Sequence, residues 1–215
     1  MRSRATQALI AATVLLAIGY SALVSRSGAG TNPPVRTPNP RALAYFSDGT
    51  GWLDKRTPQD AAMAESSFKL AIAADSTYAD PHAGLAQVYM SYAMDNFGDY
   101  EPTQYFLEAR AEAQRALELD STVAEAHAAL ANVRMFYEFD WPGAEREFTL
   151  FRKQDAHAVN GTSFRCVFFE LTGRFADAVD TALVDVGLQP RSEQARIELA
   201  RAYLFNGQYD NVGSA

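Results

Sequence analysis

Apolar residues recur three and four positions apart along most of this chain, which is the pattern of amphipathic helices. Leu85, Ala86 and Tyr89 form one such group. The alanines in these groups would let two helix backbones approach closely. The pattern therefore predicts an all-α protein built from pairs of packed helices.

A repeat organises these helices along the sequence. Residues 75–88 (DSTYADPHAGLAQV) recur as residues 120–133 (DSTVAEAHAALANV), with nine of fourteen residues identical at the same offsets. Equivalent alanines of the second helices stand at Ala64, Ala109, Ala144 and Ala178. Their spacings are 45, 35 and 34 residues, and a period near 34 is typical of helix-turn-helix solenoids.

Capping residues mark where the predicted helices begin and end. Thr57, Asp140 and Ser192 each precede a helical stretch and are side chains that accept hydrogen bonds at helix N-termini. Gly173 and Gly207 follow the apolar positions of two first helices. Glycine at such a position predicts the end of a helix.

These units resemble tetratricopeptide repeats, whose first helix carries a large residue, Leu, a small residue and Tyr, and whose second carries Ala, Phe, Ala and Pro. Residues 56–89 and 116–133 are similar in particular to repeats found beside bacterial winged-helix regulators, adenylate cyclases and serine/threonine kinases. The resemblance implies a tetratricopeptide-type α-solenoid of about four helical hairpins plus a partial fifth. Ser76 and Ser121 depart from the pattern because they stand where it has proline.

We expect three segments along the chain. Residues 1–27 form a membrane anchor or signal segment, residues 28–40 a linker rich in proline and glycine, and residues 41–215 the repeat domain. The units are expected at about 41–78, 79–123, 124–158 and 159–192, with a partial unit at 193–215. No closing helix follows the last unit. The sequence therefore leaves open a fragment of a longer protein, or an uncapped end that is covered by a partner or by self-association with another copy of the chain.

The N-terminal segment is long enough to cross a bilayer. Residues 5–25 carry no charge, and Arg4 and Arg26 flank them. A helix of this length would extend about 31 Å, against about 30 Å of hydrocarbon. Small residues at 27–29 offer a signal-peptide cleavage site instead. We expect a membrane-anchored protein with its repeats on the periplasmic or extracytoplasmic side, or a secreted protein after cleavage.

Charge and cysteine content narrow the functional classes. From Arg41 onward the chain has 15 basic and 26 acidic residues. Such an acidic body repels phosphate backbones, so nucleic acid is not an expected partner. Cys166 is the only cysteine, so no intrachain disulfide can form, and its small-residue position predicts a buried thiol.

Catalytic and metal-binding patterns are missing from the sequence. His82 and His127 occupy equivalent repeat positions, which favours a packing role between paired helices over metal binding. Glu145 and Glu147 lie two positions apart on one helix, so we expect solvated side chains rather than an acid and base pair. No glycine-rich phosphate loop or nucleophile elbow occurs. We predict no cofactor, no metal and no catalytic residues.

The resemblance also implies a concave groove lined by the first helices. Carried over residue by residue, the groove positions are Asp80, Gln87, Met90, Glu125, Asn132, Met135, Phe136, Glu170, Arg201 and Leu204. The competing interpretation is that the apolar members pack between units. Methionine and aromatic side chains mixed with acids suggest a partner segment that is apolar and carries some positive charge.

The sequence favours a non-catalytic scaffold, tethered to the membrane, that binds a partner peptide or protein in this groove. The alternative is the sensory or regulatory portion of a bacterial signalling protein, such as an adenylate cyclase, a kinase or a transcription regulator. A repeat-based glycan transferase would need a nucleotide-sugar domain that these residues do not contain.

Overall fold

Nine α-helices make up most of the described part of the chain, which in the computed structural model comprises residues 38–53, 55, 57–95, 101–155 and 162–214. The helices are α2 (Pro40–Leu53), α3 (Pro58–Ala74), α4 (Asp80–Asp95), α5 (Pro102–Leu119), α6 (Ala124–Val133), α7 (Trp141–Gln154), α8 (Thr162–Leu171), α9 (Phe175–Leu188) and α10 (Glu193–Phe205). A π-helix (Arg134–Glu138) continues α6, and a 3-10 helix (Tyr209–Ser214) follows α10. No strand occurs in these residues, so the predicted all-α class is confirmed for them.

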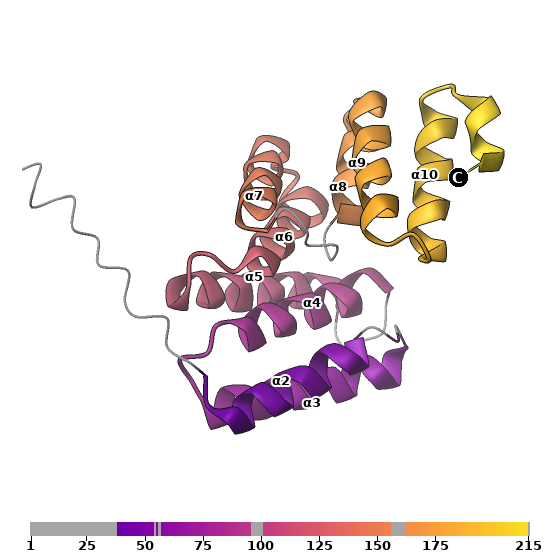
Figure 1. Cartoon of the computed structure of the whole chain (residues 1–215). Helices are drawn as coiled ribbons and strands as arrows, with labels where there is room; N and C mark the ends of the chain where they lie inside the picture. Colours follow the sequence, from indigo (N-terminus) through magenta and orange to yellow (C-terminus); the bar gives the residue numbers. More distant parts are fainter. Residues whose placement is uncertain (1–37, 54, 56, 96–100, 156–161, 215) are drawn as a thin grey trace, which may run out of the picture. The chain divides into compact units, whose positions relative to one another are not determined.

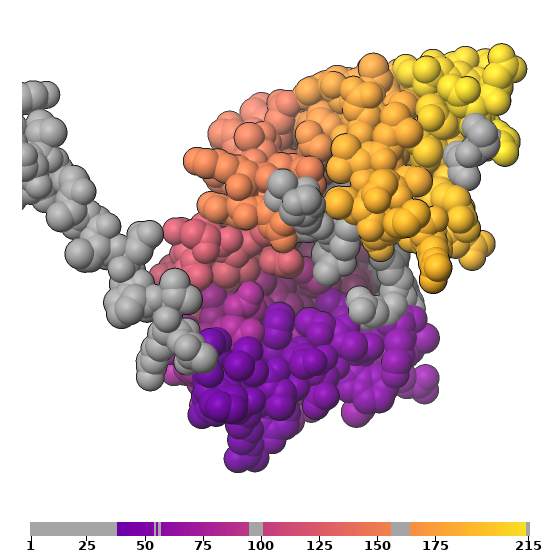
Figure 2. All heavy atoms as spheres, in the orientation of Figure 1, coloured from indigo at the N-terminus to yellow at the C-terminus, as the bar shows by residue number. Residues whose placement is uncertain are grey.

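The helices form a series of hairpins (Figure 1). Within the hairpins α2 packs on α3, α4 on α5, α6 on α7 and α8 on α9, while α10 packs on α9 and the 3-10 helix. First helices of neighbouring hairpins also touch, since α4 contacts both α2 and α6, and α10 contacts α8. Side chains fill the spaces between neighbouring ribbons (Figure 2). The first helices thus contact one another in two groups, α2 with α4 and α6, and α8 with α10, which are together called the first-helix layer below.

The predicted helix starts are confirmed by side-chain caps. The Thr57 hydroxyl accepts a hydrogen bond from the backbone N–H of Asp60 at 3.2 Å. The Asp140 carboxylate accepts one from Gly143 N–H at 2.9 Å, and Ser192 caps α10 in the same way. Each cap satisfies a backbone donor that the first helical turn leaves unpaired.

The predicted helix ends at two glycines are also confirmed. Gly173 has a φ of 74° and Gly207 a φ of 73°. This left-handed conformation lets the backbone N–H groups after α8 and α10 bond back to carbonyls of the last helical turn. A side chain at either position would be strained, which explains the choice of glycine.

Aspartate side chains stabilise two of the turns between units by local hydrogen bonds. Asp75 Oδ1 accepts from the backbone N–H of Thr77 at 3.1 Å and from its hydroxyl at 2.7 Å. Asp120 Oδ1 makes the same two bonds to Thr122, at 2.8 and 2.6 Å. Such local bonds fix a turn without a proline ring. They account for the recurrence of Asp-Ser-Thr where the tetratricopeptide pattern has proline.

Phe68 is the centre of the N-terminal core. It is fully buried on α3 and packs within an apolar cluster that includes Leu85 and Val88 of α4. A Cβ placed at Gly49 of α2 would lie 2.5 Å from the Phe68 ring, and one at Gly84 of α4 would lie 2.6 Å from it. The two glycines therefore leave the space that the ring occupies.

A π-helix leads from α6 into the turn before α7. It ends at Phe139, whose φ of 56° is left-handed and whose side chain is exposed. The Arg134 guanidinium lies 3.3 Å from the Asp140 carboxylate and 3.2 Å from that of Glu147. One side chain thus joins the π-helix to the cap and to the body of α7.

The expected anchor at residues 1–27 lies outside the described residues, as does most of the linker. In the part of the chain that the structure describes, no helix has both the length and the apolar composition needed to span a membrane.

Candidate functional site

The predicted groove positions separate into buried and accessible side chains. Met90, Asn132 and Met135 are 5%, 5% and 1% exposed. The Glu170 side chain is 9% exposed. The accessible positions are Asp80, Gln87, Glu125, Phe136, Arg201 and Leu204. A ligand lying along the first helices in this conformation could therefore contact six of the ten side chains.

Both methionines belong to the core, so the competing interpretation, packing between helices, describes them. Met90 packs against Ala109 and Val133, and Met135 lies in the cluster around Cys166. Their long unbranched side chains fill the gaps that small residues leave between paired helices. Neither presents surface to a partner.

Asp80 and Glu125 form an acidic pair of equivalent positions at the starts of α4 and α6. Partial burial raises the pKa of each carboxyl group above its usual value. Neighbouring negative charges, Asp120 for Asp80 and Asp80 itself for Glu125, act in the same direction. Neither carboxylate forms an ion pair with a described basic residue, so this end of the layer has an uncompensated negative charge.

At the other end of the layer the predicted groove residues pair with one another. Arg201 Nε of α10 donates to Glu170 Oε1 of α8 at 3.0 Å. The Nη2 atom of Arg201 is buried without a hydrogen-bond partner. Leu204, one turn further along α10, is 49% exposed. A charged pair beside an exposed leucine is suited to a partner with mixed polar and apolar groups.

Asn132 is the one predicted groove residue with an unsatisfied amide oxygen. The side chain lies on α6, and its Oδ1 atom is buried without a hydrogen-bond partner. A buried acceptor left unpaired costs about 1 to 3 kcal/mol relative to a satisfied one. Because this atom is buried, a partner in the groove cannot reach it in this conformation.

Two histidine–glutamate pairs, one partly buried and one buried, hold first and second helices together. His82 Nδ1 of α4 lies 2.6 Å from Glu112 Oε2 of α5, and His127 Nδ1 of α6 lies 2.7 Å from Glu147 Oε2 of α7. The packing role predicted for both histidines agrees with these positions. The prediction of a solvated Glu147 is wrong, because this side chain is 8% exposed and also contacts Arg134.

Cys166 lies fully buried on α8, as its repeat position predicts. Burial raises the pKa of its thiol to about 12, and the nearby carboxylates of Glu198 and Asp185 act in the same direction. Such a thiol carries little thiolate near neutral pH. Within the described ranges, no group of three or more His, Cys, Asp or Glu side chains could hold a metal ion.

The sequence repeat and the series of hairpins together define a tetratricopeptide-like repeat protein. No protein-family model matches the chain, and no curated protein matches it. Among solved structures it is similar to MamA protein, with 17% identity over 81% of this chain and 87% of that chain and a TM-score of 0.48. A second MamA structure gives 18% identity over 76% and 88%, with a TM-score of 0.49. A tetratricopeptide repeat protein from Parabacteroides merdae gives 14% identity over 81% of this chain and 63% of its own, with a TM-score of 0.47.

Proposed function

We propose that this chain is a non-catalytic protein-interaction scaffold that binds a partner along its layer of first helices. The observation that carries the proposal is the pair of equivalent, partly buried carboxylates Asp80 and Glu125, which have no basic partner among the described residues. A carboxylate that is desolvated without a counter-ion is costly to keep charged. A lysine or arginine side chain of a partner would compensate that cost.

The remaining accessible positions define the rest of the partner's chemistry. Phe136 is partly exposed and Leu204 is 49% exposed, so both offer apolar contact. Gln87 of α4 can donate and accept hydrogen bonds. The partner that fits best is a peptide segment with a basic residue near Asp80 and Glu125 and apolar residues further along.

Site-specific photo-crosslinking in the source cell tests this surface. A photoreactive phenylalanine replaces Gln87 on the first-helix layer of the full chain, and the matched control replaces Gln114, which is exposed on the second helix α5. We expect a discrete crosslinked partner from position 87 and none from position 114. Asp80→Asn with Glu125→Gln should remove that product. Equal crosslinking from both positions, or a product insensitive to the acid changes, would refute the proposal.

The raised pKa values of Asp80 and Glu125 give the binding a defined pH dependence. A basic partner needs both groups ionised, so affinity should fall as the pH is lowered from about 7 to about 4. Folding alone changes in the opposite sense: a carboxyl whose pKa is raised in the folded state stabilises the fold at low pH, and that contribution is lost as the pH rises through the raised value. Binding that strengthens at low pH would contradict the proposal.

We propose in addition that the scaffold is tethered to a membrane through residues 1–27, with the repeats outside the cytoplasm. The support is the uncharged run at residues 5–25 between Arg4 and Arg26. Alkaline carbonate extraction of membranes should leave the full chain in the pellet, while protease added outside the cytoplasm should degrade the repeats. Release into the supernatant would favour cleavage of the segment instead.

A further inference from the structure

Arg152 of α7 stands at a repeat position that is otherwise apolar. Eight residues after the alanine that recurs in each second helix, the other units have Ile72, Leu117 and Val186. Each of these three side chains packs against an apolar cluster. An arginine at such a site violates the repeat's own pattern, and local violations of this kind concentrate at functional sites.

Arg165 of α8 violates the pattern in the same way on the facing helix. Its equivalents in the other first helices are Leu85, Leu130 and Leu199, which are 2%, 6% and 5% exposed. At each of the other junctions the two equivalent apolar residues share a cluster: Ile72 with Leu85, Leu117 with Leu130, and Val186 with Leu199. The junction of α7 and α8 therefore holds two arginines where the other three hold an apolar pair.

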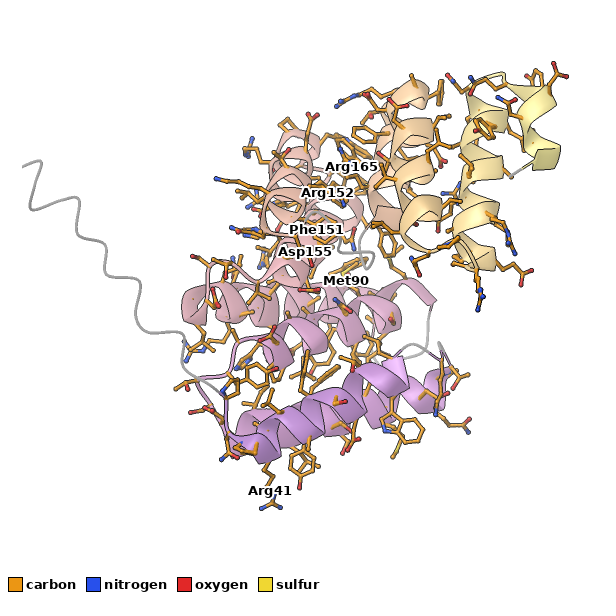
Figure 3. All side chains as sticks on the ribbon, viewed as in Figure 1. Arg41, Met90, Phe151, Arg152, Asp155 and Arg165 are labelled. Atoms are coloured by element: carbon orange, nitrogen blue, oxygen red, sulfur yellow. The ribbon has the colours of Figure 1, made fainter. Side chains whose placement is uncertain are left out.

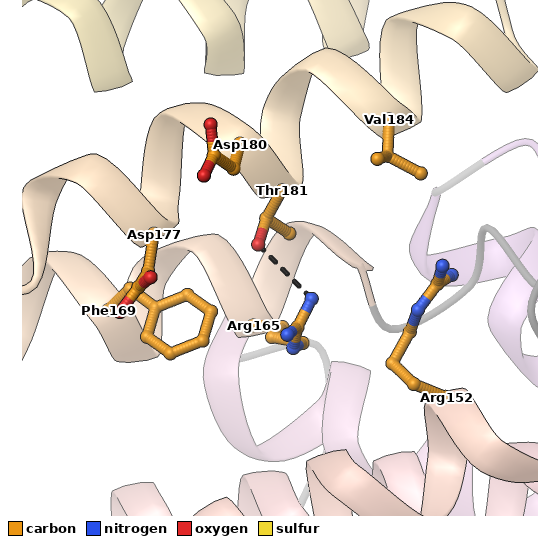
Figure 4. A pocket seen from close by; sticks show the side chains of 7 residues that line it. All are labelled: Arg152, Arg165, Phe169, Asp177, Asp180, Thr181 and Val184. Atoms are coloured by element: carbon orange, nitrogen blue, oxygen red, sulfur yellow. Dashed lines mark hydrogen bonds between the residues drawn. The ribbon is translucent and has the colours of Figure 1, made fainter.

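The two arginines line a cavity of about 270 Å³. Both lie close together where α7 meets α8 (Figure 3), and their guanidinium groups point toward α9 (Figure 4). Arg165 Nη1 donates to the Thr181 hydroxyl at 3.1 Å, and its guanidinium lies 4.9 Å from the centre of the Phe169 ring. These two contacts hold Arg165 in one orientation. The cavity is completed by Asp177, Asp180 and Val184 of α9.

Carboxylates lie near the two cations of the cavity without a direct ion pair among the described residues: Asp185 interacts with Arg152, and Asp177 with Arg165. No ion pair involves Arg152 or Arg165, and the Nη1 atom of Arg152 is buried without a hydrogen-bond partner. Burial, followed by the positive charge of Arg152, lowers the pKa of Arg165. The Asp177 carboxylate accepts a hydrogen bond from Arg174 Nε at 2.7 Å.

The fourth unit also lacks the acid that the second and third units have three residues after the recurring alanine of the second helix. Glu112 and Glu147 bond to histidines within their own hairpins, and the equivalent residue of α9 is Thr181. A glutamate at position 181 would lie beside Arg165, because the threonine hydroxyl already does. The Thr181 hydroxyl therefore occupies the place beside Arg165 where an acid at this position would lie.

We propose that the cavity between α7, α8 and α9 binds a single carboxylate group through Arg152 and Arg165. Guanidinium groups match the planar, two-oxygen geometry of a carboxylate, and such bonds are among the strongest that proteins form. Asp177 and Asp180 also line the cavity, and they disfavour a phosphate because its additional negative charge would lie near them. The carboxylate can come from an acidic side chain of a protein or from a small free acid. This site is separate from the first-helix groove and does not depend on it.

Arginine side-chain NMR of the full chain, labelled with ¹⁵N-arginine, tests the site directly. The probes are acetate, the capped tripeptide acetyl-Ala-Glu-Ala-amide, its neutral Gln analogue, and inorganic phosphate. The Nε–H signals of Arg152 and Arg165, assigned from Arg152→Gln and Arg165→Gln, should shift saturably with the two carboxylate probes. Either substitution should weaken binding at least about tenfold, since each removes charge-assisted hydrogen bonds. Arg146→Gln, exposed on the same helix α7, should change nothing.

A stability measurement separates binding from a structural role. Arg152→Leu with Arg165→Leu restores the apolar pair of the other junctions, so the unliganded double variant should unfold at the same or a higher urea concentration than the wild type and should bind no probe. Tighter binding of the tripeptide than of acetate identifies a protein side chain as the source; the reverse identifies a free acid. Absence of saturable shifts, preference for phosphate, or marked destabilisation of the double variant would each overturn the proposal.

Discussion

Replacing Gly84 by alanine tests whether the space around Phe68 is the reason for the glycines that face it. In an ordinary helix interior this change stabilises a protein by about 0.5 to 1 kcal/mol. Here the new methyl group would lie 2.6 Å from the Phe68 ring, which is fully buried. Overpacking of a filled core costs about 1 to 3 kcal/mol. The free energy of unfolding should therefore fall by about 1 to 2 kcal/mol.

Gly187→Ala is the matched control, because no atom lies within 4 Å of a Cβ at that position in α9. It should raise the free energy of unfolding by about 0.5 to 1 kcal/mol. Urea denaturation followed by far-ultraviolet circular dichroism measures both variants. If Gly84→Ala stabilises the protein as much as Gly187→Ala does, the steric explanation is refuted.

A double-mutant cycle with Phe68→Leu identifies the partner of the clash. The smaller leucine leaves room for the methyl group, so Gly84→Ala should cost little or nothing in that background. The coupling free energy should be at least about 1 kcal/mol, which is above the error expected for independent sites. Additive effects of the two substitutions would show that the alanine is disfavoured by something other than the ring.

Changes at three other positions should each lower stability by a different route. Glu147→Ala leaves His127 without its buried acceptor and should cost about 2 to 4 kcal/mol in urea denaturation; a loss below about 0.5 kcal/mol would contradict the pairing. Gly143→Ala places a Cβ 1.8 Å from Asp140 Oδ2, so the helix cap must shift, and thermal denaturation should show a loss of about 1 to 2 kcal/mol. Gly173→Ala forces a left-handed alanine and should cost about 1 kcal/mol by the same assay; an unchanged midpoint for either variant would contradict its cause.

The helical hairpins were predictable because the repeat is visible in the sequence itself. Identical residues at identical offsets, with caps at Thr57, Asp140 and Ser192, locate the helices without any tertiary information. Residue spacing alone could not predict which side of a first helix faces solvent. Met90 and Met135 follow the groove register but reach the core, because a flexible side chain can turn inward from a position near the boundary.

The buried polar residues could not be predicted from single charged positions, because a charged residue taken alone is typical of the surface. Glu147 looks solvated beside Glu145, yet its register matches Glu112, and Ser67 and Thr181 are the polar residues at that register in the other units. The signal in the sequence is that polar residues recur at one equivalent position of otherwise apolar repeat units. Comparing equivalent positions across the units also identifies the two arginines of the α7–α8 junction.

The π-helix at 134–138 is where the third hairpin accommodates one extra residue. Ala131 and Ala144, on the first and second helices of that hairpin, are thirteen positions apart, whereas the equivalent Cys166 and Ala178 of the next hairpin are twelve apart. A π-turn takes in one residue more than an α-turn. The insertion therefore widens the helix instead of lengthening a loop.

The connections from each second helix to the next first helix, at the opposite edge of the array, do not vary in length. From each second-helix alanine to the equivalent position on the next first helix the interval is always nineteen residues: Ala64 to Ala83, Ala109 to Ala128, Ala144 to Ser163, and Ala178 to Ile197. Two of these connections contain the Asp-Ser-Thr turns, whose hydrogen bonds need a fixed number of residues. Length variation is thus confined to the edge where first helices turn into second helices. New loops, affinity tags or reporter domains should be inserted at that edge. The third unit already has an insertion of one residue there, and the second unit has one of eleven residues.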